Sequence, residues 1–288
     1  MLHNSQRDNI CILQRPHLWS FLWYNVFGDD MNEYLEFAKE MAYDAGKIMK
    51  KYFTGDNGAN YKFDQTIVTK ADTEINSLLI ERVKEKFPTH SVDGEEEQFG
   101  KSDYVWVCDP VDGTAMYARH VPVAVFSLAL VIDGVSTVGV VYDPFLDNLY
   151  TAVKGSGAYR NGEKISVNDT KLEDMRSVSN VDMWPEAKYN LYDSIKELGK
   201  KTYFVGIGSV IRACMCVANG DFNLAIFPGT THKNCDIAAA KVIVEEAGGK
   251  VTNLFGEEQR YDQSIKGAVV SNSIVHDEVI NVLTENLK

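Results

Sequence analysis

The stretch Tyr104-Val105-Trp106-Val107-Cys108-Asp109-Pro110-Val111-Asp112-Gly113-Thr114 decides the fold that we expect. Its first five residues form a short apolar run, which is typical of a buried β-strand. Asp109 and Asp112 end that strand, and two neighbouring carboxylates repel each other unless a cation lies between them. Mg²⁺ is usually held by a few carboxylates together with water and phosphate oxygens. The stretch therefore predicts a divalent-metal site at the end of a strand.

Two other acidic stretches extend this prediction. Gly94-Glu95-Glu96-Glu97 reads as a loop, and Asp236-Ile237-Ala238-Ala239-Ala240 reads as the start of a helix whose small side chains allow close packing on a sheet. Taken singly, an Asp at a helix start is usually a cap and a Glu run is usually a solvated surface. Thr114 would begin a further helix, and exposed amides at a helix start bind anions. Carboxylates for metal beside amides for phosphate indicate metal-assisted phosphate chemistry.

Composition narrows the class of protein. The chain has 288 residues and is 45% hydrophobic, enough for the core of one large domain or two intimate ones. Its net charge of −12 argues against a nucleic-acid polymer as partner. The five cysteines fit no zinc pattern, so we expect reduced thiols and a cytoplasmic location. No apolar run approaches the roughly 20 residues of a membrane span.

Residues 1–30 differ from the rest because they have no clear hydrophobic period. We interpret them as a leader outside the domain, either misassigned or appended. The alternative is a docking or membrane-surface segment that uses Trp19, Phe21, Trp23 and Phe27. From Met31 on, apolar residues recur at helical spacing and predict an amphipathic helix.

The remaining pattern predicts an α+β fold. We expect further helices near 72–87, 185–199, 209–219, 236–247 and 275–287, and strands at 104–108, 123–132, 135–142, 148–153, 202–206, 222–227 and 267–271. Asp133-Gly134 and Asn161-Gly162 predict hairpin turns. Strands cluster in the middle of the chain with helices around them, which favours layered sheets. We predict one domain over 31–288, with two intimate sub-domains that meet near 150–185.

The stretch 106–117 resembles the metal-binding motif of the inositol monophosphatase family, which are magnesium-dependent, lithium-sensitive phosphatases. Four other segments resemble motifs of the same family in the same order, and the match runs from about Met31 to the C-terminus: 67–72, 94–96, 155–162 and 236–249. The resemblance implies the layered α-β-α-β-α sugar-phosphatase fold, commonly as a homodimer. It also implies a small phosphorylated substrate and two or three Mg²⁺ ions.

The resemblance implies specific roles for individual residues. The metal ligands would be Glu95, Asp109, the carbonyl of Val111, Asp112 and Asp236. Thr114, hydrogen-bonded to Asp72, would activate the attacking water together with Glu95. The amides of residues 113–115 would hold the phosphate. Substrate contacts are implied for Val111, Asp112, Gly113, Thr114, Ala115, Gly208, Ser209 and Asp236. Lys233 is added to the expected substrate contacts because of its charge.

Two positions depart from the family pattern. Cys235 stands where the family usually has Trp, and Phe227 stands where inositol-specific members have a Glu that bonds ring hydroxyls. Phe cannot accept such a bond. The segment 228–234 is about two residues longer than usual, and Lys233, His232 and Arg212 would suit a second phosphate.

These observations predict a Mg²⁺-dependent phosphomonoesterase acting on a small polyol or sugar phosphate of the inositol-1-phosphate type. Within the enzyme class, the alternatives are fructose-1,6-bisphosphatase and 3′(2′),5′-bisphosphate nucleotidase. An alternative of another class is a catalytically idle dimeric regulatory relative, but such a relative is expected to lose a metal ligand, and all five positions are kept. A structural Ca²⁺ domain is disfavoured because no Asp-x-Asp-x-Asp-Gly loop is present.

Overall fold

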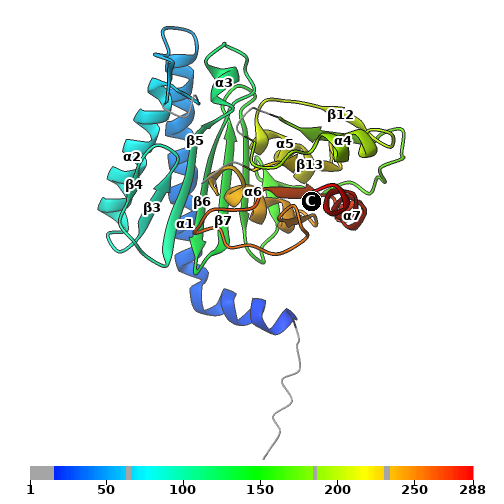
Figure 1. The fold of residues 1–288 in the computed structure, drawn as a ribbon. Coiled ribbons are helices and arrows are strands. Elements are labelled where there is room, and N and C mark those ends of the chain that lie inside the picture. Colours follow the sequence, from blue (N-terminus) through cyan, green and yellow to red (C-terminus); the bar gives the residue numbers. More distant parts are fainter. Residues whose placement is uncertain (1–15, 63–65, 184–186, 230–233, 288) are drawn as a thin grey trace, which may run out of the picture.

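The computed structural model describes residues 16–62, 66–183, 187–229 and 234–287. These residues form five layers in which helices and sheets alternate (Figure 1). The layered α-β-α-β-α architecture that we expected is therefore confirmed. The helices are α1 (Pro16–Phe53), α2 (Lys70–Lys86), α3 (Thr114–Tyr117), α4 (Tyr192–Leu198), α5 (Val210–Ala218), α6 (Cys235–Glu246) and α7 (His276–Asn286).

The first sheet has eight strands in the order β10-β9-β8-β7-β6-β5-β3-β4. Only β3 and β5 pair in parallel, so these two strands end at the same edge of the sheet. The strands are β3 (Ser91–Gly94), β4 (Gln98–Phe99), β5 (Tyr104–Asp112), β6 (Val125–Ile132), β7 (Val135–Asp143), β8 (Asn148–Val153), β9 (Ala158–Arg160) and β10 (Glu163–Lys164).

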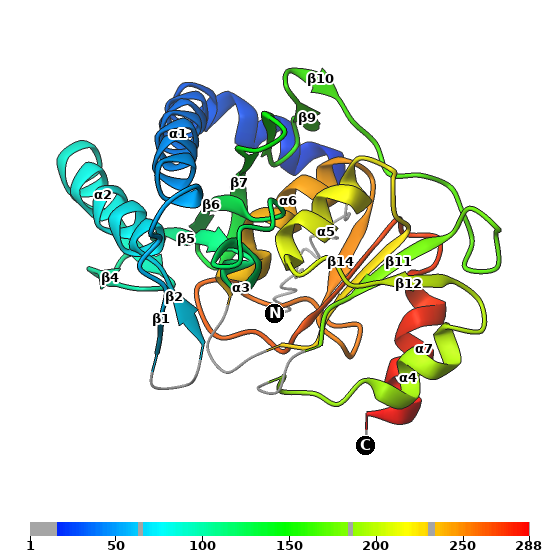
Figure 2. The ribbon, with the colours of Figure 1, turned by 90° about the horizontal axis from the view of Figure 1, so that it is seen from above.

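Side chains of β5 alternate between two cores, as the pleat of a strand requires. Trp106 and Cys108 pack with α1 and α2 on the outer face of the sheet. Val107 packs in the core that α5 and α6 fill between the two sheets. Figure 2 shows this order, with α1 and α2 on one side of the first sheet and α5 and α6 on the other. A strand buried on both faces explains why its sequence is a continuous apolar run.

The second sheet has five strands in the order β12-β11-β13-β15-β14. β11 pairs in parallel with both β12 and β13, while β15 is antiparallel to its neighbours β13 and β14. Its outer face packs against α4 and α7 in a third apolar cluster. The strands are β11 (Val178–Val181), β12 (Tyr203–Val205), β13 (Leu224–Phe227), β14 (Lys250–Thr252) and β15 (Ala268–Ser271), and a separate pair joins β1 (Asn60–Tyr61) to β2 (Ile67–Val68).

The predicted strands all form, and both predicted hairpin turns connect neighbouring antiparallel strands, with positive φ at Asp133, Gly134, Asn161 and Gly162. Eight strands were not predicted (β1–β4, β9, β10, β11 and β14). They have only two to four residues, too few for a period to be read.

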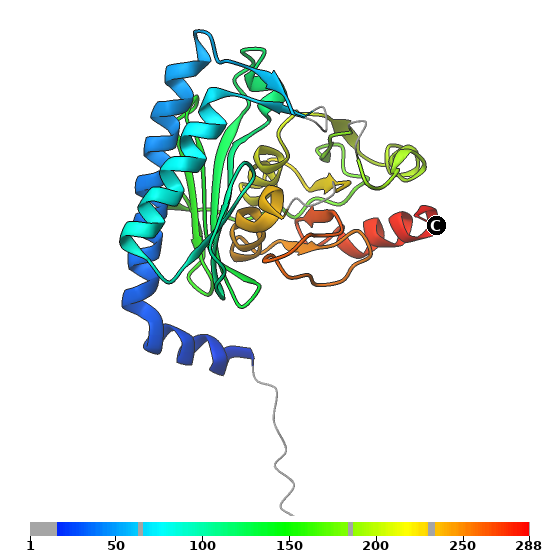
Figure 3. The same ribbon diagram turned by 60° about the vertical axis from the view of Figure 1, so that its left-hand side comes forward.

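Two helix predictions were wrong in extent. Among the described residues, the first helix already includes Pro16 instead of beginning at Met31, and its first described turns bend away from the body of the protein (Figure 3). Residues 16–28 are apolar without a helical period, so periodicity could not locate this start. The helix expected at 185–199 covers only Tyr192–Leu198 among the described residues. The first sheet ends at Lys164 and the second begins at Val178, and the sub-domain boundary between them stays a prediction. Among the described residues, no helix has both the length and the apolar character that crossing a membrane requires.

Candidate metal centre

Strand pairing brings the first two acidic stretches together. Gly94 at the end of β3 lies opposite Cys108 of β5, and the Glu95 amide donates to the Cys108 carbonyl at 3.1 Å. Because the strands are parallel, Glu95 emerges beside Asp109 at the same edge of the sheet. Asn76 of α2 fixes this loop, since its Oδ1 accepts from the Glu96 amide at 3.2 Å and its Nδ2 donates to the Glu97 carbonyl at 3.0 Å. Sequence reasoning missed Asn76, because a lone Asn within a helix carries no signal.

Close packing of α6 brings in the third stretch. A Cβ added at Gly139 of β7 would lie 2.6 Å from Val242 Cγ1 and 2.8 Å from the Ala239 carbonyl oxygen, so the helix contacts the sheet where there is no side chain. The Ser136 hydroxyl also donates to the Ala238 carbonyl. The helix therefore packs closely on the sheet, as expected, and the contacts at Gly139 show that the missing side chain on β7 permits this approach. Asp236 lies in the first turn of α6, at the edge of the sheet where β5 ends.

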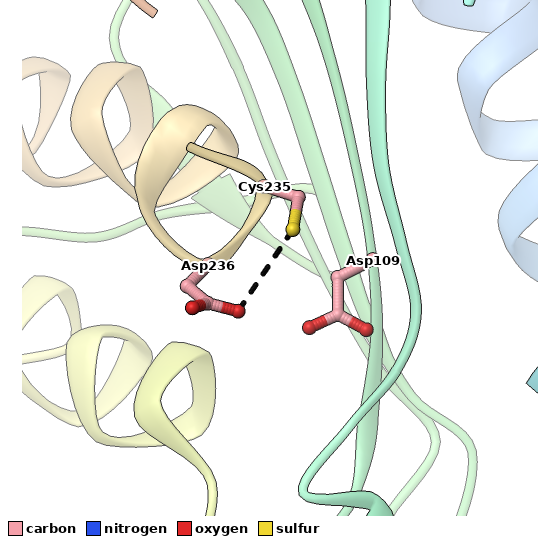
Figure 4. A group of neighbouring side chains, drawn as sticks. All are labelled: Asp109, Cys235 and Asp236. Carbon is pink, nitrogen blue, oxygen red and sulfur yellow. Dashed lines mark hydrogen bonds between the residues drawn. The ribbon is translucent and has the colours of Figure 1, made fainter. Parts of the chain in front are cut away.

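Asp109, Cys235 and Asp236 form the first group of possible metal ligands. One ligand atom from each lies within 4.8 Å of the others, and all three residues are buried. Figure 4 shows the two carboxylates and the thiol turned toward one another across the gap between β5 and α6. Asp109 Oδ1 accepts from the Val111 amide at 3.0 Å, and the Cys235 thiol lies 3.9 Å from Asp236 Oδ1.

Asp72, Glu95 and Glu96 form a second group within the same 4.8 Å limit. Asp72 is fully buried in the first turn of α2, where its Oδ2 accepts from the Thr69 amide at 2.8 Å and the Thr69 hydroxyl at 2.5 Å. Burial and then the charge of Glu95 raise the pKa of Asp72 to about 7. Lys62 binds this group through its Nζ, 2.5 Å from Glu96 and 3.3 Å from Glu95. Lys62 was not predicted, since a single Lys in a polar loop is ordinary.

Asp112 belongs to neither group among the described residues. Its Oδ2 accepts from the Ile211 amide at 2.8 Å and from the Ser209 hydroxyl, both at the start of α5. Burial, followed by the negative charge of Asp236, raises the pKa of Asp112 to about 7. The structure thus connects Asp112 to the predicted substrate loop at 208–209.

The turn after β5 is held in a left-handed conformation at Gly113, with φ of 87°. A Cβ there would lie 2.8 Å from the Gly208 carbonyl oxygen, so the turn lies directly against the 208–209 loop. Thr114 Oγ1 donates to the Val111 carbonyl at 2.8 Å and lies 3.4 Å from Asp72 Oδ1. The Thr114 hydroxyl therefore contacts both Asp72, as expected, and a predicted metal ligand. Ala115 follows in α3.

Of the three residues suggested for a second phosphate, the structure describes only Arg212. Arg212 forms an ion pair with Asp143 at 2.6 Å, and both side chains are largely buried. Lys233 and His232 lie outside the described residues. Phe227 is 1% exposed within the core between the sheets. Asp182, which follows β11, was not predicted, and its Oδ1 accepts from the Gly208 amide at 2.9 Å.

The donor set fits a divalent cation. Carboxylates buried together disfavour their own charge, which is why the pKa values of Asp72 and Asp112 are raised. A bound cation would reverse that penalty, and Mg²⁺ prefers oxygen ligands of this kind. Only the Cys235 thiol departs from an all-oxygen set.

Comparison with known proteins gives matches over most of the chain. Residues 30–288 match the model of the inositol monophosphatase family. A protein of Aquifex aeolicus named fructose-1,6-bisphosphatase/inositol-1-monophosphatase is 33% identical over 271 residues, covering 88% of this chain and 96% of that protein. A protein of the same name from Thermotoga maritima is 32% identical over 220 residues, covering 76% and 83%. The solved structure of a Thermotoga maritima IMPase has a TM-score of 0.78 at 30% identity, covering 88% of this chain and 97% of that one.

Proposed function

Because the chain belongs to the inositol monophosphatase family, whose members are metal-dependent phosphoric monoester hydrolases, we propose that it uses Mg²⁺ to hydrolyse a small polyol or sugar phosphate. The observation that carries this proposal is the meeting of three acidic stretches at one sheet edge. Glu95 follows β3, Asp109 and Asp112 end β5, and Asp236 begins α6. The family's chemistry explains why a folded protein keeps so many buried carboxylates together.

The residues proposed to hold two or three Mg²⁺ ions are Glu95, Asp109, Asp112, Asp236 and the carbonyl of Val111. When bound, the metal supplies a Lewis acid that lowers the pKa of water and neutralises charge at phosphorus. Thr114 and Asp72 orient the attacking water, because the Thr114 hydroxyl keeps its lone pairs while it donates to a neighbouring oxygen. Glu95 accepts the proton from this water. Its carboxylate is close enough for that role because it lies within 4.8 Å of the Asp72 carboxylate, which contacts Thr114.

We assign phosphate binding to the turn after β5. The amides of Gly113, Thr114 and Ala115 begin α3, and the αL conformation of Gly113 lets the backbone approach a ligand without a side chain. Gly208 and Ser209 form the adjoining wall through the close contact between Gly208 and Gly113. Lys233 remains a proposed substrate contact because of its charge and its place in the longer segment before Asp236.

For the substrate, we propose an inositol-1-phosphate-type polyol or sugar phosphate, with fructose-1,6-bisphosphate as the second candidate. The second candidate is favoured by the two bacterial relatives that are both named fructose-1,6-bisphosphatase/inositol-1-monophosphatase. The burial of Phe227 also supports it, since this position offers no acceptor for an inositol hydroxyl.

A phosphate-release panel tests the proposal. The full chain with Mg²⁺ is assayed on inositol-1-phosphate, fructose-1,6-bisphosphate and adenosine 3′,5′-bisphosphate. We expect hydrolysis of one or both of the first two, loss of activity with EDTA and its recovery with added Mg²⁺. Hydrolysis that persists in EDTA would contradict the metal mechanism, and a strict preference for the nucleotide would contradict the substrate class.

We further propose, on the family resemblance, lithium sensitivity and a homodimer. The cysteine usage supports a cytoplasmic location. Lithium sensitivity is tested by adding LiCl to the phosphate-release assay. The homodimer is tested by light scattering after size-exclusion chromatography. We also propose that residues 31–288 are the phosphatase domain, which predicts that deletion of residues 1–30 leaves the phosphate-release rate unchanged.

A further inference from the structure

The acceptor for substrate hydroxyls is missing at position 227, where inositol-specific relatives have a Glu. Phe227 is the last residue of β13, and its side chain is buried in the apolar core between the two sheets. Neither its chemistry nor its placement allows it to bind a polyol. Among the described residues, we looked for a side chain at this end of the second sheet that offers an acceptor to a hydroxylated substrate.

Asp182 lies at the same end of the sheet. It directly follows β11, which pairs in parallel with β13, and Val181 lies opposite Ile226. The next residue on each strand is therefore Asp182 on β11 and Phe227 on β13. A carboxylate thus stands one strand away from the position where the family carries its Glu.

Hydrogen bonds hold the Asp182 side chain in place and leave some of its acceptor sites unoccupied. Its Oδ1 accepts from the Gly208 amide at 2.9 Å, and its Oδ2 accepts from Asn180 Nδ2 at 3.1 Å. Each carboxylate oxygen has room for a further hydrogen bond, and the residue is only half-buried. A rigid carboxylate with spare acceptor sites is suited to a pair of neighbouring hydroxyl groups.

The turn at 208–209 connects Asp182 to the metal centre. Gly208 binds Asp182 through its amide, and the next residue, Ser209, donates its hydroxyl to Asp112. The same turn lies against the proposed phosphate turn at Gly113.

We propose that Asp182 accepts hydrogen bonds from the hydroxyl groups of the substrate and so selects polyol and sugar phosphates over phosphates that lack hydroxyls. This inference rests on the proposed phosphatase function, because it concerns the part of the substrate that does not react. Asp182 acts as a specificity residue that contacts the hydroxyl groups of the substrate, and it is linked to the phosphate-binding turn through the Gly208 amide.

The test compares substrates with and without hydroxyl groups. Asp182→Asn and Asp182→Ala are assayed with Mg²⁺ on inositol-1-phosphate, fructose-1,6-bisphosphate and phenyl phosphate, whose leaving group has no other hydroxyl. In Asp182→Asn, which keeps an oxygen for the Gly208 amide, loss of the charged acceptor is expected to lower kcat/KM about 10- to 100-fold for the hydroxylated substrates, mainly through KM, and to leave phenyl phosphate within about twofold. Asp182→Ala also leaves that amide without its acceptor and should lower kcat/KM for the hydroxylated substrates at least as far. Asp193→Asn, an exposed carboxylate in the first turn of α4, is the matched control and should change nothing.

Each other outcome has a definite meaning. An equal loss on all three substrates would show that Asp182 only holds the 208–209 turn and would overturn the inference. No loss on any substrate would show that Asp182 does not touch the substrate and would overturn it as well. Asn keeps an oxygen for the Gly208 amide, so Asp182→Asn is expected to fold normally. Circular dichroism of both variants distinguishes a binding defect from misfolding. A wild-type chain that hydrolyses none of the three would instead contradict the proposed function itself.

Discussion

The Ser209 hydroxyl donates a hydrogen bond to the carboxylate of Asp112, a residue 97 positions earlier in the chain. This contact joins the end of β5 in the first sheet to the start of α5 in the middle layer, and the Ile211 amide binds the same oxygen at 2.8 Å. Asp112 is therefore both a proposed metal ligand and the partner of a helix start. This contact links the proposed metal centre to the packing of the helical layer.

Replacing Ser209 by Ala tests that link. The change removes one donor from a buried carboxylate, and it also removes the cap that accepts from the Arg212 amide at 3.3 Å. We expect the free energy of unfolding to fall by about 1–3 kcal/mol, measured by urea denaturation without metal. Ser209→Thr keeps the hydroxyl and should lose much less. Equal stability of wild type and Ser209→Ala would mean that the contact does not stabilise the fold.

Asp109→Asn and Asp236→Asn should each lower the rate of phosphate release by at least about 100-fold, because each removes a proposed metal ligand. Folding should be preserved, since Asn at position 109 can still accept from the Val111 amide. The rate is measured with saturating Mg²⁺, and circular dichroism monitors the fold. Asp103→Asn, an exposed carboxylate just before β5, is the control with full activity expected. Full activity in either ligand variant would refute the assignment.

Mg²⁺ should raise the melting temperature of the wild-type chain, because a ligand that binds only the folded state stabilises it by mass action. At a Mg²⁺ concentration about 100 times Kd, this stabilisation is about 2.7 kcal/mol. Asp236→Asn should shrink the shift and should not lower the melting temperature without metal, since it relieves repulsion with Asp109 and Asp112. Thermal denaturation with and without MgCl₂ measures both effects. A shift of wild-type size in the variant would place the ions elsewhere.

The thiol of Cys235 should raise the affinity of the candidate site for metals that bind sulfur. Its thiol lies within 4.8 Å of ligand oxygens of Asp109 and Asp236, and sulfur favours Zn²⁺ or Co²⁺ over Mg²⁺. We expect Co²⁺ to give a sulfur-to-cobalt absorption band in the near ultraviolet that Cys235→Ser abolishes. Magnesium affinity should stay the same in that variant. Cys216→Ser, another described thiol outside this group, should keep the band. A band that survives Cys235→Ser would show that the thiol is not a ligand.

His276 should make stability depend on pH between about 4 and 6.5. It is buried between the hydroxyls of Thr252 and Ser271, and burial followed by the nearby charge of Lys250 lowers its pKa from 6.5 to about 4. Since the folded pKa is the lower one, the unfolded chain binds more protons in this range. The contribution to stability is therefore present above pH 6.5 and is lost as the pH falls, by up to about 1.4 kcal/mol per pH unit.

His276→Gln removes that titration and should flatten the curve. Urea denaturation of both chains at pH 7.5, 6 and 5 measures the difference, in which the other titrating groups cancel. If the free energies of unfolding of the two chains changed in parallel with pH, His276 would have the same pKa in the folded and unfolded states.

Much of the fold followed from local patterns. Strands buried on both faces are mostly apolar, so β5 to β8 were predictable from their composition. The Asp133-Gly134 and Asn161-Gly162 turns were predictable because their backbone requires positive φ. The start of α1 at Pro16 was not, because residues 16–28 have no helical period.

The type of chemistry could be predicted from motifs alone, because the carboxylates of Glu95, Asp109, Asp112 and Asp236 stand in motifs that resemble those of a phosphatase family. The spatial arrangement of these carboxylates depends on the three-dimensional fold. The parallel pairing of β3 with β5 brings Glu95 to Asp109, and the bare backbone at Gly139 lets α6 carry in Asp236. The pairing of Asp182 with Gly208, and the burial of Phe227 one strand away, likewise depend on contacts between distant residues. Such contacts arise from sheet register and close packing, which no local pattern in the chain encodes.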